Sequence, residues 1–199
     1  MIERADTTIW RELISGNKTA FQQLMHQYFR VLFSYGTKFS RDEELVKDTI
    51  QELFIRLWDR KAHLAADVNP KAYLLASLRR ALHRKTTVQD RFSSYDSLED
   101  SINFFDFELS VEHAFIQKEG SASLAKEIAD KVAGLPKRQK EVVYLKFFQE
   151  MSRDEISTTM GISPQTVSNL LQSALKKLRS ELNRIMLAFI ALFLKKAGA

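Results

Sequence analysis

The chain has 199 residues, of which 45% are hydrophobic and 28% are charged, a balance typical of a soluble protein that can bury a core. Its formal net charge of +5 favours a polyanionic partner. The absence of Cys excludes disulfides and thiolate metal sites and makes a reducing cytoplasm the expected compartment. The first residues lack the apolar core of a signal peptide, and the longest apolar run, Ile185 to Leu194, is shorter than the roughly 20 residues that span a bilayer. We therefore expect neither export nor a membrane span.

Apolar residues recur at spacings of three and four along most of the chain, which predicts an all-α fold. A first helix is expected over about Thr8 to Ser15, a second from Thr19 to Tyr35, and a third from about Arg41 to Trp58. Pro70 suits the first position of a fourth helix, because the N–H that it lacks is not needed there. This helix continues into the basic run 79–85.

The helical pattern fails between residues 86 and 112, where acidic residues outnumber basic ones. A loop of that length inside a compact domain is unusual. We therefore interpret it as an acidic linker, 86–112, between two small helical domains, 1–85 and 113–184, with an apolar extension over 185–199. Aromatic residues in the linker indicate that part of it docks on a surface.

The second block contains a pattern typical of a helix-turn-helix. A helix opens at Leu135-Pro136, and a shorter one follows a capping box formed by Ser152 and Glu155. Gly161 supplies a turn, and Ser163-Pro164 begins the next helix with a good N-cap and a good first residue. In this motif the second helix enters the major groove of DNA.

Polar residues lie on the predicted outer face of that second helix. Gln and Asn pair with adenine edges, whereas Lys and Arg bind phosphates or guanine. The expected DNA contacts are Gln165, Thr166, Ser168, Asn169, Gln172, Lys176, Lys177 and Arg179. In the alternative interpretation, they are solvated positions on a helical hairpin.

Both blocks resemble extracytoplasmic-function sigma factors, the initiation subunits of bacterial RNA polymerase in the sigma-70 family. The first block resembles their domain two in Gly16, Ala20-Phe21, Leu24, Tyr28, Asp48, Gln51 to Trp58, Asn69 and Lys71 to Leu74. The second resembles their domain four in Leu135-Pro136, Arg138, Glu155-Ile156, Gly161 to Ser163, Thr166-Val167, Ala174-Leu175 and Leu178-Arg179. The resemblance implies an alternative sigma factor that binds core polymerase and directs promoter-specific initiation.

The resemblance also implies roles for individual residues. The polymerase-binding residues would be Asp48, Gln51, Glu52, Arg56 and Trp58. The contacts that melt the minus-ten element would be Asn69, Lys71, Tyr73, Arg79, Arg80 and Arg84. For Trp58 and Tyr73, a role in the core stays open. Relatives usually have Asn at the position of Arg80, where it lines a pocket for a captured base.

The resemblance assigns the minus-thirty-five element to the helix-turn-helix. Relatives thread a segment like the acidic linker toward the polymerase active site, and a solvated spacer is the alternative. An inhibitory anti-sigma protein would be a further partner. Two other classes stay open, a free-standing helix-turn-helix regulator and a helical interaction module.

Sequence motifs for catalysis or metal binding are absent. The histidines are His26, His63, His83 and His113, and none has a partner at metal-ligand spacing. The sequence also lacks a Gly-rich phosphate loop and a nucleophile motif. We expect no cofactor, no metal site and no enzymatic activity of the chain itself.

Apolar residues from Leu171 to Leu192 recur at alternating steps of four and three, so the recognition helix is predicted to continue to about Lys195. Residues 185–194 are apolar all round, and a helix of that kind is normally buried. We expect this tail to dock on the N-terminal domain or on an anti-sigma partner and thereby restrain DNA binding.

Overall fold

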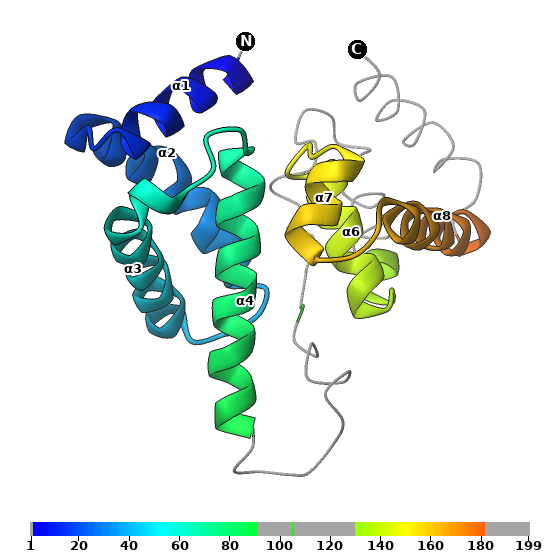
Figure 1. The fold of residues 1–199 in the computed structure, drawn as a ribbon. Coiled ribbons are helices and arrows are strands. Elements are labelled where there is room, and N and C mark those ends of the chain that lie inside the picture. The colour runs from blue at the N-terminus through cyan, green and yellow to red at the C-terminus, as the bar shows by residue number, and fades with distance from the viewer. Residues whose placement is uncertain (1, 91–104, 106–129, 182–199) are drawn as a thin grey trace, which may run out of the picture. The chain divides into compact units, whose positions relative to one another are not determined.

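The computed structural model describes residues 2–90, 105 and 130–181 of the chain, and the chain forms two compact units whose main division falls between residues 104 and 105. Within those described residues the regular structure is helical and contains no strand (Figure 1). The predicted all-α fold is confirmed.

The first unit contains four α-helices and one short 3-10 helix among its described residues. They are α1 (Ile2–Ile14), α2 (Lys18–Gly36), α3 (Glu43–Asp59), η1 (Lys61–His63) and α4 (Pro70–Asp90). Helix α2 contacts α1, α3 and α4, and α3 also packs along α4 (Figure 1). The largest fully buried side chains of this unit are Trp10, Tyr35, Phe54, Leu13, Leu24, Leu32, Ile50, Leu74, Leu75, Leu78 and Leu82.

Gly36 marks a close approach between three helices. A Cβ atom at this position would lie 2.6 Å from Cγ1 of Val46 on α3 and 3.5 Å from Leu78 on α4. Those side chains belong to the core, so they have little room to move. The end of α2 can therefore approach α3 and α4 this closely only because the residue is glycine.

Two helix ends differ from the sequence prediction. Helix α1 begins at Ile2 and not near Thr8, and α4 continues to Asp90, so the predicted linker starts inside this helix. Residues 86–88 are β-branched, which lowers helix propensity only slightly. Each residue added to an existing helix gains one backbone hydrogen bond, so a weak local signal does not stop it.

The second unit contains the predicted helix-turn-helix. Its elements are α6 (Lys137–Phe147), α7 (Arg153–Met160) and α8 (Pro164–Glu181), and residues 130–133 are also helical. Helix α6 packs against α8. The buried apolar residues of this unit include Val142, Leu145, Ile156, Val167, Ala174 and Leu178.

The local signals that predicted the motif are present. The Ser152 backbone N–H donates to Oε2 of Glu155 at 2.6 Å, and the Glu155 N–H donates to Oγ of Ser152 at 3.3 Å, which is the capping box that begins α7. Gly161 has a φ of +66° in the turn before α8, a conformation that favours glycine. The predicted continuation of the recognition helix to Lys195 and the apolar extension 185–199 lie outside the described residues.

Candidate nucleic-acid interface

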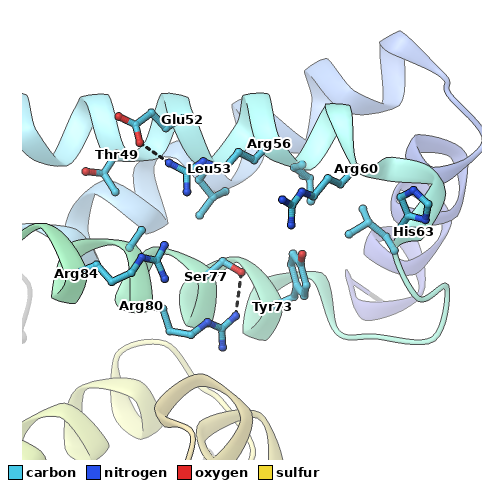
Figure 2. Close-up of a pocket in the computed structure, with 13 residues that line it drawn as sticks. Thr49, Glu52, Leu53, Arg56, Arg60, His63, Tyr73, Ser77, Arg80 and Arg84 are labelled. Atoms are coloured by element: carbon cyan, nitrogen blue, oxygen red, sulfur yellow. Dashed lines mark hydrogen bonds and ion pairs between the residues drawn. The ribbon is translucent and has the colours of Figure 1, made fainter.

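A groove of about 390 Å³ lies between α3 and α4 of the first unit (Figure 2). Its lining residues are Thr49, Glu52, Leu53, Arg56, Leu57, Arg60, His63, Leu64, Tyr73, Ser77, Arg80, Ala81 and Arg84. Four of them are arginines and one is a carboxylate. Because arginine stays protonated at any physiological pH, the groove is strongly cationic.

Helical spacing explains why these side chains face one another. Glu52 and Arg56 are four residues apart on α3 and share one face of that helix, and Arg60, four residues further on, is the cap residue that follows it. On α4 the corresponding residues are Tyr73, Ser77, Arg80 and Arg84. Figure 2 shows the two rows on opposite sides of the groove, with Tyr73 and His63 toward one end and Glu52 and Arg84 toward the other.

Glu52 ties the two helices together at the rim of the groove. Its carboxylate accepts hydrogen bonds from Nη2 of Arg56 at 2.7 Å and from Nζ of Lys85 at 2.8 Å. The hydrogen bond from Lys85 is the main reason why the pKa of Glu52 is lowered, and the charges of Lys85 and Arg56 act in the same direction against partial burial. This residue was predicted to bind polymerase, but its carboxylate is engaged within the unit.

The outward face of α3 is polar with one large apolar side chain. Asp48 and Gln51 are exposed, and Ile55 is 61% exposed. Ile55 was not among the predicted polymerase contacts, although its position four residues after Gln51 puts both on the same face. Arg56, which was among them, lies on the groove side.

Trp58, the fifth predicted polymerase contact, packs inside the unit. It is half-buried, its ring centroid lies 4.9 Å from that of Phe21 on α2, and Nζ of Lys61 lies 4.3 Å from the indole centroid. These contacts fit the core role that the sequence left open for Trp58.

The groove brings together half of the predicted minus-ten residues, namely Tyr73, Arg80 and Arg84. Arg80 donates to Oγ of Ser77 at 3.3 Å and is otherwise exposed. Tyr73 is half-buried and presents its ring to the groove. A half-buried aromatic ring beside cations suits the stacking of an unpaired base whose phosphates are held nearby.

Three predicted minus-ten residues do not line the groove, namely Asn69, Lys71 and Arg79. Oδ1 of Asn69 accepts from the Ala72 N–H at 2.9 Å and so caps the start of α4. Arg79 is only 9% exposed, so its predicted DNA contact is not part of the groove and stays a prediction. One step along an α-helix turns a side chain by about 100°, which carries Arg79 away from the face of Arg80.

The sequence prediction missed Arg60, His63 and Leu64 as groove residues. One signal could have found Arg60. Arg56 near the end of α3 and Arg60 just after it repeat the four-residue spacing of Arg80 and Arg84 on α4, so the sequence contains two pairs of arginines at helical spacing. The packing of α3 on α4 is what turns them into a groove.

Helix α8 presents an amide face to solvent. Gln165, Asn169 and Gln172 are exposed, and their spacings of four and three put them on one side of the helix. Nε2 of Gln165 donates to Oδ1 of Asn169 at 3.0 Å, which orients both amides along the surface. This face offers the donors and acceptors that read base edges.

Two of the predicted base contacts on α8 are used within the helix. Oγ of Ser163 accepts from the Thr166 N–H at 3.1 Å and lies 2.8 Å from the Thr166 hydroxyl. The Ser168 hydroxyl donates to the carbonyl of Pro164 at 3.2 Å. Both residues are half-buried, so they shape the N-terminus of α8 more than its outer face.

The cations near the end of α8 also differ from one another. Lys176 and Arg179 are exposed, whereas Nζ of Lys177 donates to the carbonyl of Gly134 at 2.9 Å. Lys177 therefore joins α8 to the turn before α6. Phosphate contact fits Lys176 and Arg179 better.

Among the described residues, no cluster of three or more His, Asp or Glu side chains could hold a metal ion. None of the helices in that part of the chain is long and apolar enough to cross a membrane.

An all-α chain with a helix-turn-helix in one unit and an arginine-lined groove in the other has the features of a nucleic-acid-binding protein. Residues 24–92 match the family model described as Sigma-70 region 2, and residues 125–178 match the model described as Sigma-70, region 4. The chain belongs to the sigma-70 family. The match to region 2 precedes the match to region 4 along the chain, as the sequence predicted. Together they confirm the predicted function, an alternative sigma factor that directs transcription initiation.

Solved structures share the fold. One is CnrH in complex with the cytosolic domain of CnrY, with a TM-score of 0.58, 21% identity, and coverage of 87% of this chain and 94% of that chain. Another is the sigma factor RpoE in complex with the anti-sigma factor NepR from Bartonella quintana, with a TM-score of 0.56, 18% identity, and coverage of 82% and 97%. No curated protein matched the sequence significantly.

Proposed function

We propose that three surfaces of this sigma factor divide the work of initiation. The groove between α3 and α4 captures the single-stranded minus-ten element, the outward face of α3 binds core RNA polymerase, and the exposed face of α8 reads the minus-thirty-five element. The observation that carries the proposal is the arginine-lined groove with the Tyr73 ring at one end, in the unit that matches region 2.

The groove has the chemistry that strand separation needs. An unpaired base can be kept out of the duplex when it stacks on an aromatic ring, and the adjacent phosphates can be neutralised by arginine. Tyr73 supplies the ring, and Arg80 and Arg84 supply cations from α4. On the other side, Arg56 supplies a cation from α3 and Arg60 supplies one from the C-cap of that helix. We therefore assign Arg56 to DNA as well as Arg60.

The outward face of α3 fits a protein partner. Ile55 gives it an exposed apolar side chain, and Asp48 and Gln51 add polar groups two turns and one turn before it on the same face. Interfaces often combine an apolar middle with a polar rim in this way. On α8, Gln165, Asn169 and Gln172 are assigned to bases, with Lys176 and Arg179 assigned to phosphates.

Several parts of the function follow from the family assignment and are proposed with it. Because α4 continues to Asp90, residues 1–90 act as sigma domain two and 91–112 as the linker. Residues 113–184 act as sigma domain four, and 185–199 as an extension. The chain is a non-catalytic subunit that acts in the cytoplasm, where core polymerase supplies the chemistry. CnrH and RpoE were each solved with a partner protein, NepR being an anti-sigma factor, and we extend an anti-sigma partner to this chain.

Run-off transcription tests the proposal. Core polymerase mixed with this chain alone should give specific transcripts from a pool of genomic promoter fragments, and core polymerase without the chain should not. Tight DNA binding by the free chain without any transcripts would favour a free-standing regulator.

Variants of the groove test where the single strand binds. The double variant Arg80→Ala with Arg84→Ala should retain core binding but lose strand opening, measured as permanganate reactivity of thymines in the minus-ten element. Arg11→Ala, an exposed arginine of α1 in the same unit, is the matched control for loss of positive charge. Equal opening by the groove variant and the control would refute the groove assignment.

A further inference from the structure

Helix α1 lies outside the residues that match region 2, yet it contacts both η1 and α4. The loop 64–69 joins those two elements at one end of the groove. The aromatic residue of this helix is Trp10, and its side chain is fully buried. The indole Nε1–H of Trp10 donates to the carbonyl of Ala65 at 2.9 Å, across 55 residues of sequence. A buried indole N–H usually finds such a partner, and here that partner is a loop carbonyl.

Ala65 belongs to the loop that leads from η1 into α4. The residue before it, Leu64, lines the groove, and Asn69 at the other end of the loop caps α4. The backbone N–H of Leu64 also donates to the carbonyl of Lys61 at 3.2 Å. Hydrogen bonds therefore hold the loop at Leu64, at Ala65 and at Asn69. The bond at Ala65 is the one that comes from Trp10.

The same indole also supports the aromatic wall of the groove. The ring centroids of Trp10 and Tyr73 lie 5.3 Å apart with a 60° angle between the planes. Tyr73 thus contacts Trp10 and also lines the groove. Tilted aromatic pairs at this separation are attractive, so Trp10 restricts the orientation of the Tyr73 ring.

We infer that Trp10 is a positioning residue for strand opening: one buried side chain sets both the Ala65 end of the loop and the Tyr73 ring against which an unpaired base would stack. The inference rests on the proposed function of the groove. Trp10 itself touches no DNA. It acts by holding two parts of the site in register, and small displacements of positioned groups cost large factors in rate.

The variant Trp10→Phe separates this role from general packing, since it keeps an aromatic ring and removes the N–H donor. Transcription from a duplex promoter recovered in the run-off screen should fall about tenfold, equivalent to about 1.4 kcal/mol, the scale of one lost hydrogen bond. Transcription from the same promoter with a pre-opened minus-ten bubble should fall much less, because strand separation is no longer required.

The control variant is Leu13→Ala, since Leu13 is also fully buried on α1. Both variants are compared below their melting temperatures, so that both are folded. Leu13→Ala should lower stability and leave the ratio of duplex to bubble transcription at the wild-type value. Hydrogen exchange of the free protein gives a second readout: the backbone amides of residues 66–68 should exchange faster in Trp10→Phe than in Leu13→Ala.

Two failures can be told apart. A wild-type chain that yields no transcripts would overturn the proposed function. A wild-type chain that does transcribe, together with equal duplex-to-bubble ratios and equal loop exchange in the two variants, would overturn the role of Trp10 alone.

Discussion

The two polar neighbours Gln51 and Glu52 act on different sides of α3. Gln51 is exposed, whereas Glu52 bridges Arg56 and Lys85. Gln51→Ala should weaken binding to core polymerase, measured by fluorescence anisotropy, with the free energy of unfolding changed by less than about 0.5 kcal/mol. A large loss of stability with normal binding would contradict this.

Glu52→Ala should behave differently in the same measurements. It removes the link between α3 and α4, so it should lower stability, but by no more than about 1 kcal/mol because solvent screens a partly exposed ion pair. Glu52→Gln keeps the size of the side chain and serves as the control for charge. If Glu52→Ala weakens core binding without any loss of stability, the carboxylate belongs to the polymerase surface after all.

His83 makes the stability of the first unit depend on pH. Burial, followed by the charges of Arg79 and Arg84, lowers the pKa of His83 below its usual value of about 6.5. In the window between the lowered pKa and about 6.5 the unfolded chain binds more protons than the folded one, so stability is full above this window and falls as the pH drops through it. The melting temperature should therefore decrease on acidification across about pH 6.5.

The His83→Gln variant should lose much of this dependence in thermal melts at several pH values. His63→Gln is the matched control, because His63 is exposed on the same unit. An equal decrease of the melting temperature in wild type and His83→Gln would assign the effect to other groups.

At the scale of single elements, the two kinds of DNA contact proposed for α8 can be separated. Gln165→Ala or Gln172→Ala should alter preference at one base pair, with each lost bidentate contact costing about 1–3 kcal/mol. Lys176→Ala or Arg179→Ala should weaken binding to all sequences and lower the salt slope by about one each. Binding of the polymerase complex to a promoter library at several salt concentrations measures both.

Lys177→Ala gives a third behaviour, because Lys177 bonds to the Gly134 carbonyl. Lys177→Ala should lower the free energy of unfolding of the second unit. It should change the salt slope of DNA binding less than Lys176→Ala or Arg179→Ala does. If neither Gln165→Ala nor Gln172→Ala changes the base preference, the exposed amide face of α8 does not read bases.

The elements that the sequence predicted well are those with strong local signals. The capping box at Ser152, the turn at Gly161 and the start of α4 at Pro70 each depend on residues within one helical turn, so they are visible without tertiary structure. The end of α4 was predicted too early, because β-branched residues weaken the helical signal but do not end a helix.

The groove was only partly predictable. The sequence pointed to Tyr73, Arg80 and Arg84 but not to Arg60, because the pairing of α3 with α4 is a tertiary contact. The burial of Arg79 was also missed. Here the sequence did carry a signal, because Arg79 lies four residues after Leu75 and three before Leu82, the spacing of one buried helix face.

At the scale of the whole molecule, both units have a basic surface toward which nucleic acid would be drawn. The groove carries four arginines, and α8 ends with exposed cations, within a chain of net charge +5. Two basic surfaces on one chain can hold two elements of one promoter, and the second contact then gains from the high local concentration set by the first. Anything that masks one surface should weaken the whole complex.

We expect the C-terminal tail, residues 185–199, to mask one of these DNA-binding surfaces. Residues 185–194 are apolar on all sides, and an exposed helix of that kind would favour aggregation. The run is too short to span a bilayer, and it lacks the polar face of an interfacial helix. We therefore predict that it is covered by the N-terminal domain in the free protein or by an anti-sigma partner.

Truncation after Arg184 tests this prediction against the full chain. If the tail restrains DNA binding, the truncated protein should bind promoter DNA without polymerase more tightly, because the restraint costs the full chain part of its binding free energy. Tail residues that dock should also be protected from hydrogen exchange in the full chain, and a full chain that needs a partner to cover the tail should be less soluble than the truncated one. Equal DNA binding by the two forms, with rapid exchange throughout residues 185–194, would show that the tail does not act on the DNA-binding surfaces, and the anti-sigma partner would then be the remaining place for it to dock.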